Sequence, residues 1–345
     1  MKMRIAIDAM GGDYAPLETV MGAVLAAREY DNDTQLILIG DKNAVNGVLS
    51  QVNNPYPEFE IIDAPDIIEM SDSPTKVLRT KPNSAVAIGS RMQKAGEIDA
   101  FVSAGNTGVF YASTLMSLGR IKGVRRPTIG TYLPSENHGT TLFDVGANPN
   151  CRPIHLLQFA IMGSIYVEYI HGWKNPSVGL LSIGHESSKG NELTIETHSV
   201  FERNLPNFYG NVEGKDILMG KVDVVICDGF VGNIILKFAE SFIDILKTKS
   251  EFYLRNKPIA KLGALIMMPA FQELKEDLDY QSYGGVPLLG ANGISIIGHG
   301  HSSRVAIKNA VRVGRKMVKE KINEHIAEKI HELIVESAKD TRENV

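Results

Sequence analysis

Short glycine-containing loops follow six apolar segments of this 345-residue chain, and this pattern constrains the fold more than any other feature. Through the first two thirds of the chain, segments typical of buried strands, such as residues 4–7 and 222–227, alternate with segments expected to be helical, such as residues 17–30, which have an apolar face, and residues 107–118. This alternation predicts a mainly parallel sheet covered by helices on both faces. The chain is therefore expected to form a three-layer, Rossmann-like α/β fold.

The organisation along the chain predicts a single domain over residues 1–340, followed by a polar, frayed tail at residues 341–345. A basic turn at residues 119–127 is a candidate subdomain boundary. Residues 234–280 lack strand signals and are expected to be helical, with breaks at Pro258 and Pro269. Residues 303–338 contain no proline and are expected to form one long helix.

Composition excludes several classes of protein. The formal net charge is -4, so there is no general excess of basic residues for binding nucleic acid. Cys151 and Cys227 form no C-x-x-C pair, which fits a reducing, cytoplasmic location. The N-terminus lacks the apolar core of a signal peptide, and the sequence has no run of about 18 apolar residues that could form a transmembrane helix.

The six loops carry most of the residues suited to chemistry. They lie at residues 8–13, 103–108, 144–148, 184–192, 228–233 and 298–302. In an open parallel sheet, ligands bind just beyond the carboxyl ends of the strands, where these loops are expected. Glycine lets backbone amides approach a ligand, and amides at a helix N-terminus attract anions. The loops therefore predict a site for an anionic group held by backbone, hydroxyl and amide donors.

The loop at residues 103–108 joins a strand to a helix. Its backbone amides and the hydroxyls of Ser103 and Thr107, with Gly105 and Asn106 between them, suit a phosphate-sized anion. A tight turn with Thr107 near the helix cap explains the same residues equally well. The chain has no G-x-x-x-x-G-K-[ST] motif and no complete dinucleotide-binding motif, so nucleotide binding is not supported.

Three polar side chains in the second half of the chain are candidates for catalysis. Lys189 precedes Gly190 and Asn191 in a loop that can place an ammonium and an amide donor on an oxyanion, although a solvated lysine is the commoner arrangement. Asp228 and Asn233 lie where a strand gives way to a helix, and they can act as a base and a ligand donor. A turn aspartate and a helix N-cap explain them nearly as well.

The first loop places Asp8 and Asp13 on either side of Gly11 and Gly12. The two carboxylates can position a substrate. A Mg²⁺ site is the less favoured alternative, because no third carboxylate converges on the pair in the sequence.

The histidines and cysteines indicate hydrogen bonding or proton transfer rather than metal binding or covalent catalysis. His299 and His301 flank Gly300 without further metal ligands at suitable spacing, so one of them is expected to donate a proton or bind substrate. Cys151 lies near His155 without an evident third group, and no G-x-S-x-G motif is present. Direct displacement between two bound substrates is the simplest mechanism.

A series of short motifs, read in order, carries a resemblance to a known family. They are Arg4-Ile-Ala-Ile-Asp-Ala-Met-Gly-Gly-Asp-Tyr-Ala-Pro16, Ser103-Ala-Gly-Asn-Thr-Gly108, Gly119-Arg-Ile-Lys-Gly123, Asp144-Val-Gly-Ala-Asn148, Ala160-Ile-Met-Gly-Ser164, Lys189-Gly-Asn-Glu-Leu-Thr194, Gly210-Asn-Val-Glu213, Asp228-Gly-Phe-Val-Gly-Asn233, Tyr283-Gly-Gly285 and His299-Gly300. Together they resemble the bacterial phosphate acyltransferases of the acyl-ACP:phosphate family, known as PlsX. The chain departs from the usual family pattern at His185-Glu-Ser-Ser188 and at His301.

The resemblance implies an enzyme that converts acyl-ACP and inorganic phosphate into acyl phosphate and free acyl carrier protein (ACP), at the start of phospholipid synthesis. It implies a fold similar to that of phosphotransacetylases and isocitrate/isopropylmalate dehydrogenases, with a long-helix subdomain. A homodimer that associates peripherally with the cytoplasmic membrane is expected. Its partners would be ACP, phosphate and the membrane acyl-phosphate:glycerol-3-phosphate acyltransferase, with no cofactor and no metal.

The residues and the resemblance together define the expected site. The catalytic assignments are Lys189, Asn233, Asp228 and His299. The phosphate- or substrate-binding assignments are Asp8, Gly11, Gly12, Ser103, Gly105, Asn106, Thr107, Asn148 and Asn191. Three other functions stay open: a phosphotransacetylase using acyl-CoA, a membrane-recruited scaffold for acyl carriers, and a metal- and NAD(P)-dependent decarboxylating dehydrogenase. The lack of a convergent triad of aspartates weighs against the last of these.

A basic stripe near the C-terminus is the expected ACP-binding surface. Its residues recur every four positions on one side of the predicted last helix, and they are Arg304, Lys308, Arg312 and Lys316. ACP is acidic, so a local basic surface suits its docking. A solvated basic face explains the stripe at least as well.

A short apolar run at residues 259–268, with Phe271 beyond it, is the expected membrane contact and is too short to span a bilayer. The cations in or just before it are Lys247, Lys249, Arg255, Lys257 and Lys261, against the acids Asp244 and Glu251. A basic, apolar helix can lie in the interface of an anionic membrane. A dimer or core helix explains the run about equally well, and the resemblance favours the membrane. The residues assigned to membrane contact are Leu262, Leu265, Ile266 and Met267.

Overall fold

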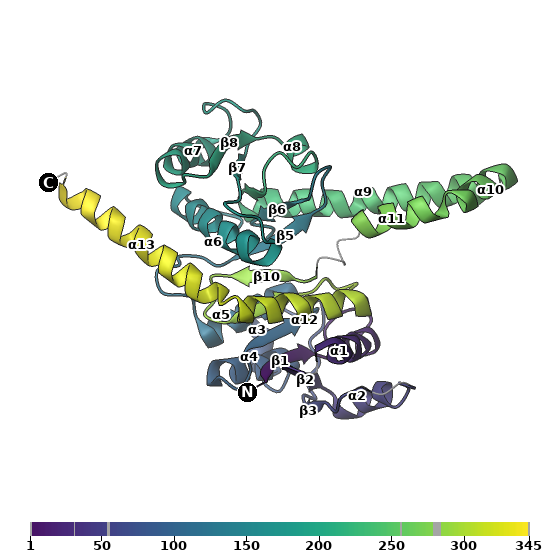
Figure 1. Cartoon of the computed structure of the whole chain (residues 1–345). Coiled ribbons are helices and arrows are strands. Elements are labelled where there is room, and N and C mark those ends of the chain that lie inside the picture. The colour runs from purple at the N-terminus through teal and green to yellow at the C-terminus, as the bar shows by residue number, and fades with distance from the viewer. Residues whose placement is uncertain (1, 31, 54–55, 256, 279–283, 344–345) are drawn as a thin grey trace.

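The computed structural model describes residues 2–30, 32–53, 56–255, 257–278 and 284–343, and Figure 1 shows the arrangement of the chain. Within these residues, one 11-stranded sheet has the order β3-β2-β1-β4-β11-β10-β5-β6-β9-β7-β8. The strands are β1 (Met3–Asp8), β2 (Thr34–Gly40), β3 (Glu60–Asp63), β4 (Ala100–Ser103), β5 (Thr128–Leu133), β6 (Thr140–Phe143), β7 (Val178–Leu181), β8 (Phe208–Val212), β9 (Val224–Ile226), β10 (Val286–Leu289) and β11 (Ile294–Ile297). The helices are α1 (Leu17–Tyr30), α2 (Lys42–Leu49), α3 (Pro74–Thr80), α4 (Ala85–Ala95), α5 (Thr107–Leu118), α6 (Pro153–His171), α7 (Glu192–Asn204), α8 (Gly214–Leu218), α9 (Gly229–Arg255), α10 (Pro258–Ile266), α11 (Met268–Leu278), α12 (Arg304–Lys319) and α13 (Ile322–Glu343).

The sheet consists of two parallel halves that run in opposite directions. Strands β1, β2, β3, β4 and β11 are parallel to one another, and so are β6, β7, β8 and β9. Strands β10 and β5 lie between the halves, and each is antiparallel to both of its neighbours. The predicted, mainly parallel α/β fold is confirmed. The six predicted loops fall into two groups of three, because each half has its own carboxyl edge.

We call residues 8–13, 103–108 and 298–302 the first loop group. They follow β1, β4 and β11, whose ends lie side by side because Ile7 pairs with Val102 and Ile297 with Ser103. Residues 144–148, 184–192 and 228–233 form the second loop group. They follow β6, β7 and β9, whose ends are aligned at Ile226.

Apolar side chains fill both faces of the sheet, which explains why its strands read as continuous hydrophobic segments. In β1, Ile5 and Ile7 pack on one face and Ala6 on the other, and all three are fully buried. Helices cover both faces (Figure 1). A parallel sheet needs this double cover, because neither of its faces is polar enough to meet water.

Helix bounds agree with the sequence pattern in the first half of the chain and depart from it at the C-terminus. Helices α1 and α5 have the predicted bounds of residues 17–30 and 107–118. The prediction of one helix over residues 303–338 is wrong, because α12 ends at Lys319 and α13 begins at Ile322. Lys321 has a φ of 52°, a left-handed conformation that a continuous α-helix does not contain. Lysine is a good helix former, so its residue type does not predict this break.

Helices α9, α10 and α11 form an arm that projects away from the sheet (Figure 1). The predicted helical character of this region is confirmed for its described residues. The first break is at Pro258, which begins α10, and the second is at Met267, two residues before Pro269. None of the helices in the described ranges is both long and apolar enough to cross a membrane.

Candidate active site

The first loop group is organised around Asp8, which is almost fully buried at the end of β1. Ser103 Oγ donates a hydrogen bond to Asp8 Oδ2 at 2.7 Å, and the Met10 backbone N–H donates to Oδ1 at 3.1 Å. Burial raises the pKa of Asp8 to about 6, against the lowering effect of these hydrogen bonds. A Cβ on Gly11 would lie only 2.7 Å from the Gly105 nitrogen, so this close approach of two loops needs glycine.

The loop after β11 closes onto the same group. The Asp13 backbone N–H donates to the Gly300 carbonyl at 2.8 Å, and His301 Nδ1 lies 3.3 Å from the Asp13 carboxylate. His299 Nε2 lies 3.5 Å from Glu240 Oε1 on α9. Burial lowers the pKa of His299 in spite of the nearby Glu240 carboxylate. The imidazole is therefore mainly neutral near pH 7 and can accept a proton.

Asn106 and Thr107 have distinct positions at the start of α5. Asn106 Oδ1 accepts a hydrogen bond from the Val109 N–H at 3.1 Å, so Asn106 is the helix N-cap, and the sequence-based placement of Thr107 near the cap is one residue late. Asn106 Nδ2 donates to the Met70 carbonyl at 2.9 Å and holds a neighbouring loop. Thr107 is exposed in the first helical position. The side chain of Asn106 thus shapes this loop and caps the N-terminus of α5.

The second loop group is built on Asp144, which is fully buried at the end of β6. Its Oδ1 accepts hydrogen bonds from the backbone N–H groups of Gly146 and Ala147 at 3.1 and 2.9 Å, and its Oδ2 accepts one from Asn148 Nδ2 at 2.5 Å. Asn148 Nδ2 also donates to the Pro127 carbonyl at 2.7 Å. Burial raises the pKa of Asp144. The side chains of Asp144 and Asn148 therefore make hydrogen bonds that hold the loop in place.

The start of α9 separates two residues that the sequence treated alike. Asp228 Oδ1 accepts a hydrogen bond from the Val231 N–H at 2.9 Å, which makes Asp228 the capping residue. Asn233 is not a cap, and its side chain is exposed. A Cβ on Gly146 would lie 3.5 Å from Asn233 Oδ1, so the amide faces the loop of Asp144. Among the described residues, the Asn233 amide has no hydrogen-bond partner.

Lys189 lies in the loop between β7 and α7. Its carbonyl accepts a hydrogen bond from Ser182 Oγ at 3.0 Å, and Gly190 has a φ of 119°, which favours glycine. Asn191 Oδ1 accepts from the Thr194 N–H at 2.9 Å and caps α7. The Lys189 side chain is exposed, and its ammonium has no ion pair or hydrogen bond to any residue that the structure describes.

Two helices link the two loop groups, which together we call the composite site. Helix α9 begins in the second group and contacts His299 of the first through Glu240, seven residues after Asn233 and about 10 Å further along the helix axis. Helix α5 begins in the first group, and burial, reinforced by the Asp144 carboxylate, raises the pKa of its Tyr111 to about 12. Sequence analysis missed Tyr111 and Glu240, because neither lies in a glycine loop and their helical spacing was the only signal.

Comparison with known proteins decides the family. The model of a family described as "Fatty acid synthesis protein" matches residues 3–325. The chain belongs to this family. A phosphate acyltransferase from Heliobacterium modesticaldum is 47% identical over 328 residues, covering 94% of this chain and 97% of the relative. A phosphate acyltransferase from Aquifex aeolicus is 45% identical over 340 residues, covering 98% and 99%. The resemblance carried by the motifs is confirmed.

Solved structures confirm the fold. A phosphotransacetylase from Streptococcus pyogenes has a TM-score of 0.61 at 15% identity and covers 92% of this chain and 94% of its own. The EutD phosphotransacetylase from Staphylococcus aureus has a TM-score of 0.57 at 14% identity, with coverage of 91% and 94%. At this identity, the likeness concerns the fold alone. The predicted similarity to phosphotransacetylases is therefore confirmed for the architecture.

Cys151 and His155 do not form a nucleophilic pair in this member of the fatty acid synthesis protein family. Burial, reinforced by the carboxylates of Asp144 and Asp228, raises the pKa of Cys151 to about 12, so a thiolate is rare near pH 7. His155 Nδ1 accepts a hydrogen bond from the Arg152 backbone N–H at 3.1 Å. In the part of the chain that the structure describes, no group of three or more His, Cys, Asp or Glu side chains is placed to hold a metal ion.

The basic stripe on α12 makes contacts within the protein. Arg304 Nη2 lies 2.5 Å from Glu18 Oε1, and Lys308 Nζ lies 3.1 Å from Glu29 Oε2, with both acids on α1. Lys316 Nζ donates to a main-chain carbonyl of α6 at 2.7 Å. These contacts pair three of the four cations of the stripe with acceptors within the protein. ACP binding at the stripe stays a prediction.

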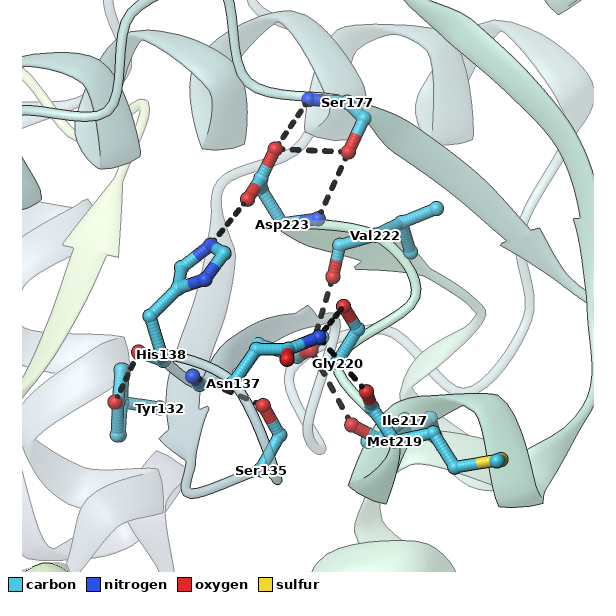
Figure 2. A network of polar contacts seen from close by, with 12 residues as sticks. Tyr132, Ser135, Asn137, His138, Ser177, Ile217, Met219, Gly220, Val222 and Asp223 are labelled. Atoms are coloured by element: carbon cyan, nitrogen blue, oxygen red, sulfur yellow. Dashed lines mark hydrogen bonds and ion pairs between the residues drawn. The ribbon is translucent and has the colours of Figure 1, made fainter.

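A separate polar network lies at the amino ends of β6, β9 and β7 (Figure 2). His138 Nε2 lies 2.8 Å from Asp223 Oδ1, while the Ser177 Oγ and backbone N–H donate to Asp223 Oδ2 at 2.8 and 2.7 Å. Asn137 Nδ2 donates to two carbonyls of the turn after α8, each at 3.3 Å. These groups bind one another and fasten the starts of the strands.

Proposed function

We propose that the protein transfers an acyl group from acyl-ACP to inorganic phosphate, giving acyl phosphate and free ACP for phospholipid synthesis. The observation that carries this proposal is the composite site. Lys189 and Asn233, donors without a partner among the described residues, lie in one loop group, and the buried Asp8 and half-buried His299 lie in the other. Relatives named phosphate acyltransferase that match nearly the full chain support the reaction class.

The chemistry requires a phosphate oxygen to attack the thioester carbonyl carbon. A C–O bond forms, the C–S bond breaks, and ACP leaves as a thiolate that takes up a proton. Negative charge develops on the carbonyl oxygen, where Lys189 and Asn233 serve as donors, and loss of the charged donor Lys189 is expected to cost about 10²–10³ in kcat. Neutral His299 accepts the proton that the attacking phosphate loses, while Asp228 caps α9 and fixes the turn that positions Asn233.

We assign phosphate binding to the backbone amides of Gly12 and of the first turn of α5, because the Gly105 N–H donates to Ser103 Oγ at 3.2 Å and the Gly11 N–H to the Asp8 carbonyl at 3.5 Å. Helix N-termini favour anions through their unpaired N–H groups. The remaining predicted binding residues act by holding loops in place through the hydrogen bonds given above. They are Asp8, Ser103, Asn106, Asn148 and Asn191.

The test is to incubate the purified protein with phosphate and either palmitoyl-ACP or palmitoyl-CoA, and to measure acyl phosphate and the released carrier by mass spectrometry. We expect product from palmitoyl-ACP with a higher kcat/KM than from palmitoyl-CoA. Preference for acyl-CoA would indicate a phosphotransacetylase. Binding of acyl-ACP with no turnover would indicate a scaffold, and either result contradicts the proposal.

We further propose that the tip of the arm lies on the membrane, because its apolar side chains are exposed in the single chain. Leu262, Leu265, Ile266 and Met267 are 61%, 63%, 74% and 54% exposed, so this run is not part of the core. Exposed cations lie nearby, including Lys249 and Lys257, whereas the side chains of Asp244, Lys247 and Lys261 lie outside the described part. Such a surface suits the interface of an anionic bilayer.

The stem of the arm is proposed as the contact of a homodimer. Phe238 and Phe242 stack on α9 with ring centroids 6.4 Å apart, and both are exposed in the single chain. Exposed aromatic patches of this kind mark interaction surfaces. A membrane-bound dimer would release its lipid-like product beside the membrane acyl-phosphate:glycerol-3-phosphate acyltransferase.

The arm is tested by changing Leu265→Asp and Ile266→Asp together and following flotation with anionic vesicles. We expect the variant to leave the vesicle fraction while it keeps its dimer by size-exclusion chromatography and its reaction in solution. The matched control is Leu218→Asp with Met219→Asp, two exposed apolar residues outside the arm. Unchanged flotation of the arm variant, or equal loss in the control, contradicts membrane contact at this tip.

A further inference from the structure

The basic turn at residues 119–127 has no part in the composite site described above. Four cations and no acidic residue lie between residues 119 and 135, and the cations are Arg120, Lys122, Arg125 and Arg126. Arg126 Nη1 donates to the Asn150 carbonyl at 2.7 Å, which places the turn beside the segment that carries a fifth cation, Arg152. We call these five residues the basic patch.

The basic patch is fixed directly against the second loop group. Asn148 Nδ2, which holds Asp144, also donates to the Pro127 carbonyl at 2.7 Å. Gln158 on α6 receives a hydrogen bond from the Arg125 backbone N–H at 2.8 Å and donates to the Gly123 carbonyl at 2.9 Å. Hydrogen bonds therefore hold the turn from both sides and fix the backbone that carries the charged side chains.

The cations of the basic patch form no ion pair with a carboxylate in the described part of the chain. Among the described residues, no carboxylate oxygen lies within 4.0 Å of a side-chain nitrogen of any of the five cations, whereas Arg304 and Lys308 on α12 are paired. All but Arg126 are exposed. Burial and the charges of Arg126, Arg125 and Arg152 together lower the pKa of His155 to about 4.

We propose that the basic patch is the docking surface for the acidic carrier protein that brings the acyl group. This inference rests on the proposed function. An acidic protein is steered to a surface of unpaired cations, and the patch borders the loop of Asp144 and Asn148. The flexible prosthetic arm of a carrier docked there has only to cross this loop to bring its thioester to Asn233.

The position of the patch favours a protein partner over a lipid surface. Gly123 packs beside α13, since a Cβ placed on it would lie 2.7 Å from Ile334 and 2.9 Å from Ile330. Helix α13 and the arm of α9 to α11 project from opposite sides of the molecule (Figure 1). A bilayer that receives the tip of the arm therefore lies away from the turn.

The experiment compares three double charge reversals, each with the same change in net charge. Lys122→Glu with Arg125→Glu alters the basic patch, and Lys308→Glu with Arg312→Glu alters the α12 stripe. Lys94→Glu with Lys174→Glu is the control, because both lysines are exposed and have no ion pair among the described residues. The readouts are KM for palmitoyl-ACP, KM for phosphate, kcat, and binding of acyl-free ACP by fluorescence anisotropy at several salt concentrations.

The basic-patch variant is expected to raise KM for palmitoyl-ACP and Kd for ACP about tenfold, with a flatter salt dependence and unchanged kcat and KM for phosphate. Unchanged affinity for ACP, an equal loss in the control, or a loss confined to the α12 variant overturns the proposal. If the wild type binds ACP but makes no acyl phosphate, the proposed function fails, and the anisotropy measurements still decide the docking surface.

Discussion

The two ends of strands β6, β7 and β9 carry polar groups of the same kinds but differ in how these groups are paired. At the amino ends, Asp223, His138 and Ser177 bind one another (Figure 2). At the carboxyl ends, Asp144 and Asp228 are used to shape their loops, while the Lys189 ammonium and the Asn233 amide have no partner among the described residues.

This difference separates structural polar networks from a site that can receive a ligand. A closed network stabilises the fold because each buried donor and acceptor is satisfied, and removal of one partner leaves the other unsatisfied. Hydrogen-bond donors on a fixed loop that have no partner, which we call open donors, contribute little to folding. They are available to stabilise negative charge that develops in a transition state. The comparison therefore predicts loss of activity at one edge and loss of stability at the other.

The largest effect is expected at Lys189. Lys189→Ala should lower kcat by about a hundredfold or more, the scale for loss of one electrostatic donor, while the melting temperature stays near that of the wild type. The matched control is Lys174→Ala, since Lys174 is also exposed but lies outside both loop groups. Steady-state kinetics with palmitoyl-ACP and phosphate provide the measurement. Wild-type kcat/KM in Lys189→Ala would remove this residue from the site.

The opposite behaviour is expected at Asp223. Asp223→Ala should destabilise the protein by about 2 kcal/mol, because it leaves Ser177 and His138 without their acceptor, while kcat/KM of the folded variant is unchanged. Chemical denaturation at pH 7 measures the difference in the free energy of unfolding. A loss of activity without a loss of stability would break the comparison.

The difference in the free energy of unfolding between wild type and Asp223→Ala should depend on pH, in a direction set by the pKa of Asp223. Burial raises the pKa of Asp223, but hydrogen bonds from His138 and Ser177 outweigh burial and hold the pKa below its ordinary value. A carboxylate with a lowered pKa contributes stability above its unfolded pKa of about 4, and this contribution is lost as the pH falls through the folded value. The stability gap between wild type and Asp223→Ala should therefore be full at pH 7 and shrink in the acid range.

A smaller effect is expected at Asn233, which donates without a formal charge. Asn233→Ala should lower kcat about tenfold with little change in stability. Asn137→Ala is the matched control, because Asn137 belongs to the closed network at the amino ends of the strands. It should lower stability without lowering kcat. If both substitutions reduce only the stability, the carboxyl and amino ends of these strands do not differ in function.

The fold could be read from the sequence because its strands and helices are marked by local patterns. Helix α1 has an apolar face at helical spacing, and both α1 and α5 matched their predicted bounds. The opposite directions of the two halves could not be predicted, since they depend on the antiparallel pairing of β5 and β10. Nor could the break at Lys321, where an ordinary helix former adopts a left-handed conformation.

The candidate site was predicted at the level of loops and less well at the level of roles. The sequence could not decide which of Asp228 and Asn233 caps α9, because both residue types cap helices and only the backbone geometry assigns the hydrogen bond. The structure likewise shows that Asn191 and Asn106 are helix caps, which their residue type alone could not decide. Glu240 was missed, because its approach to His299 depends on the path of a long helix.

The central claim, direct attack of phosphate on a thioester held by open donors, is tested most directly by intact-protein mass spectrometry. The wild-type protein is incubated with palmitoyl-ACP in phosphate-free buffer, and phosphate is then added. The account predicts that the protein mass stays unchanged in both steps, and that acyl phosphate and free ACP appear in equal amounts only after phosphate is present. A covalent palmitoyl-protein adduct before phosphate is added, or release of ACP at full rate without phosphate, would contradict the account.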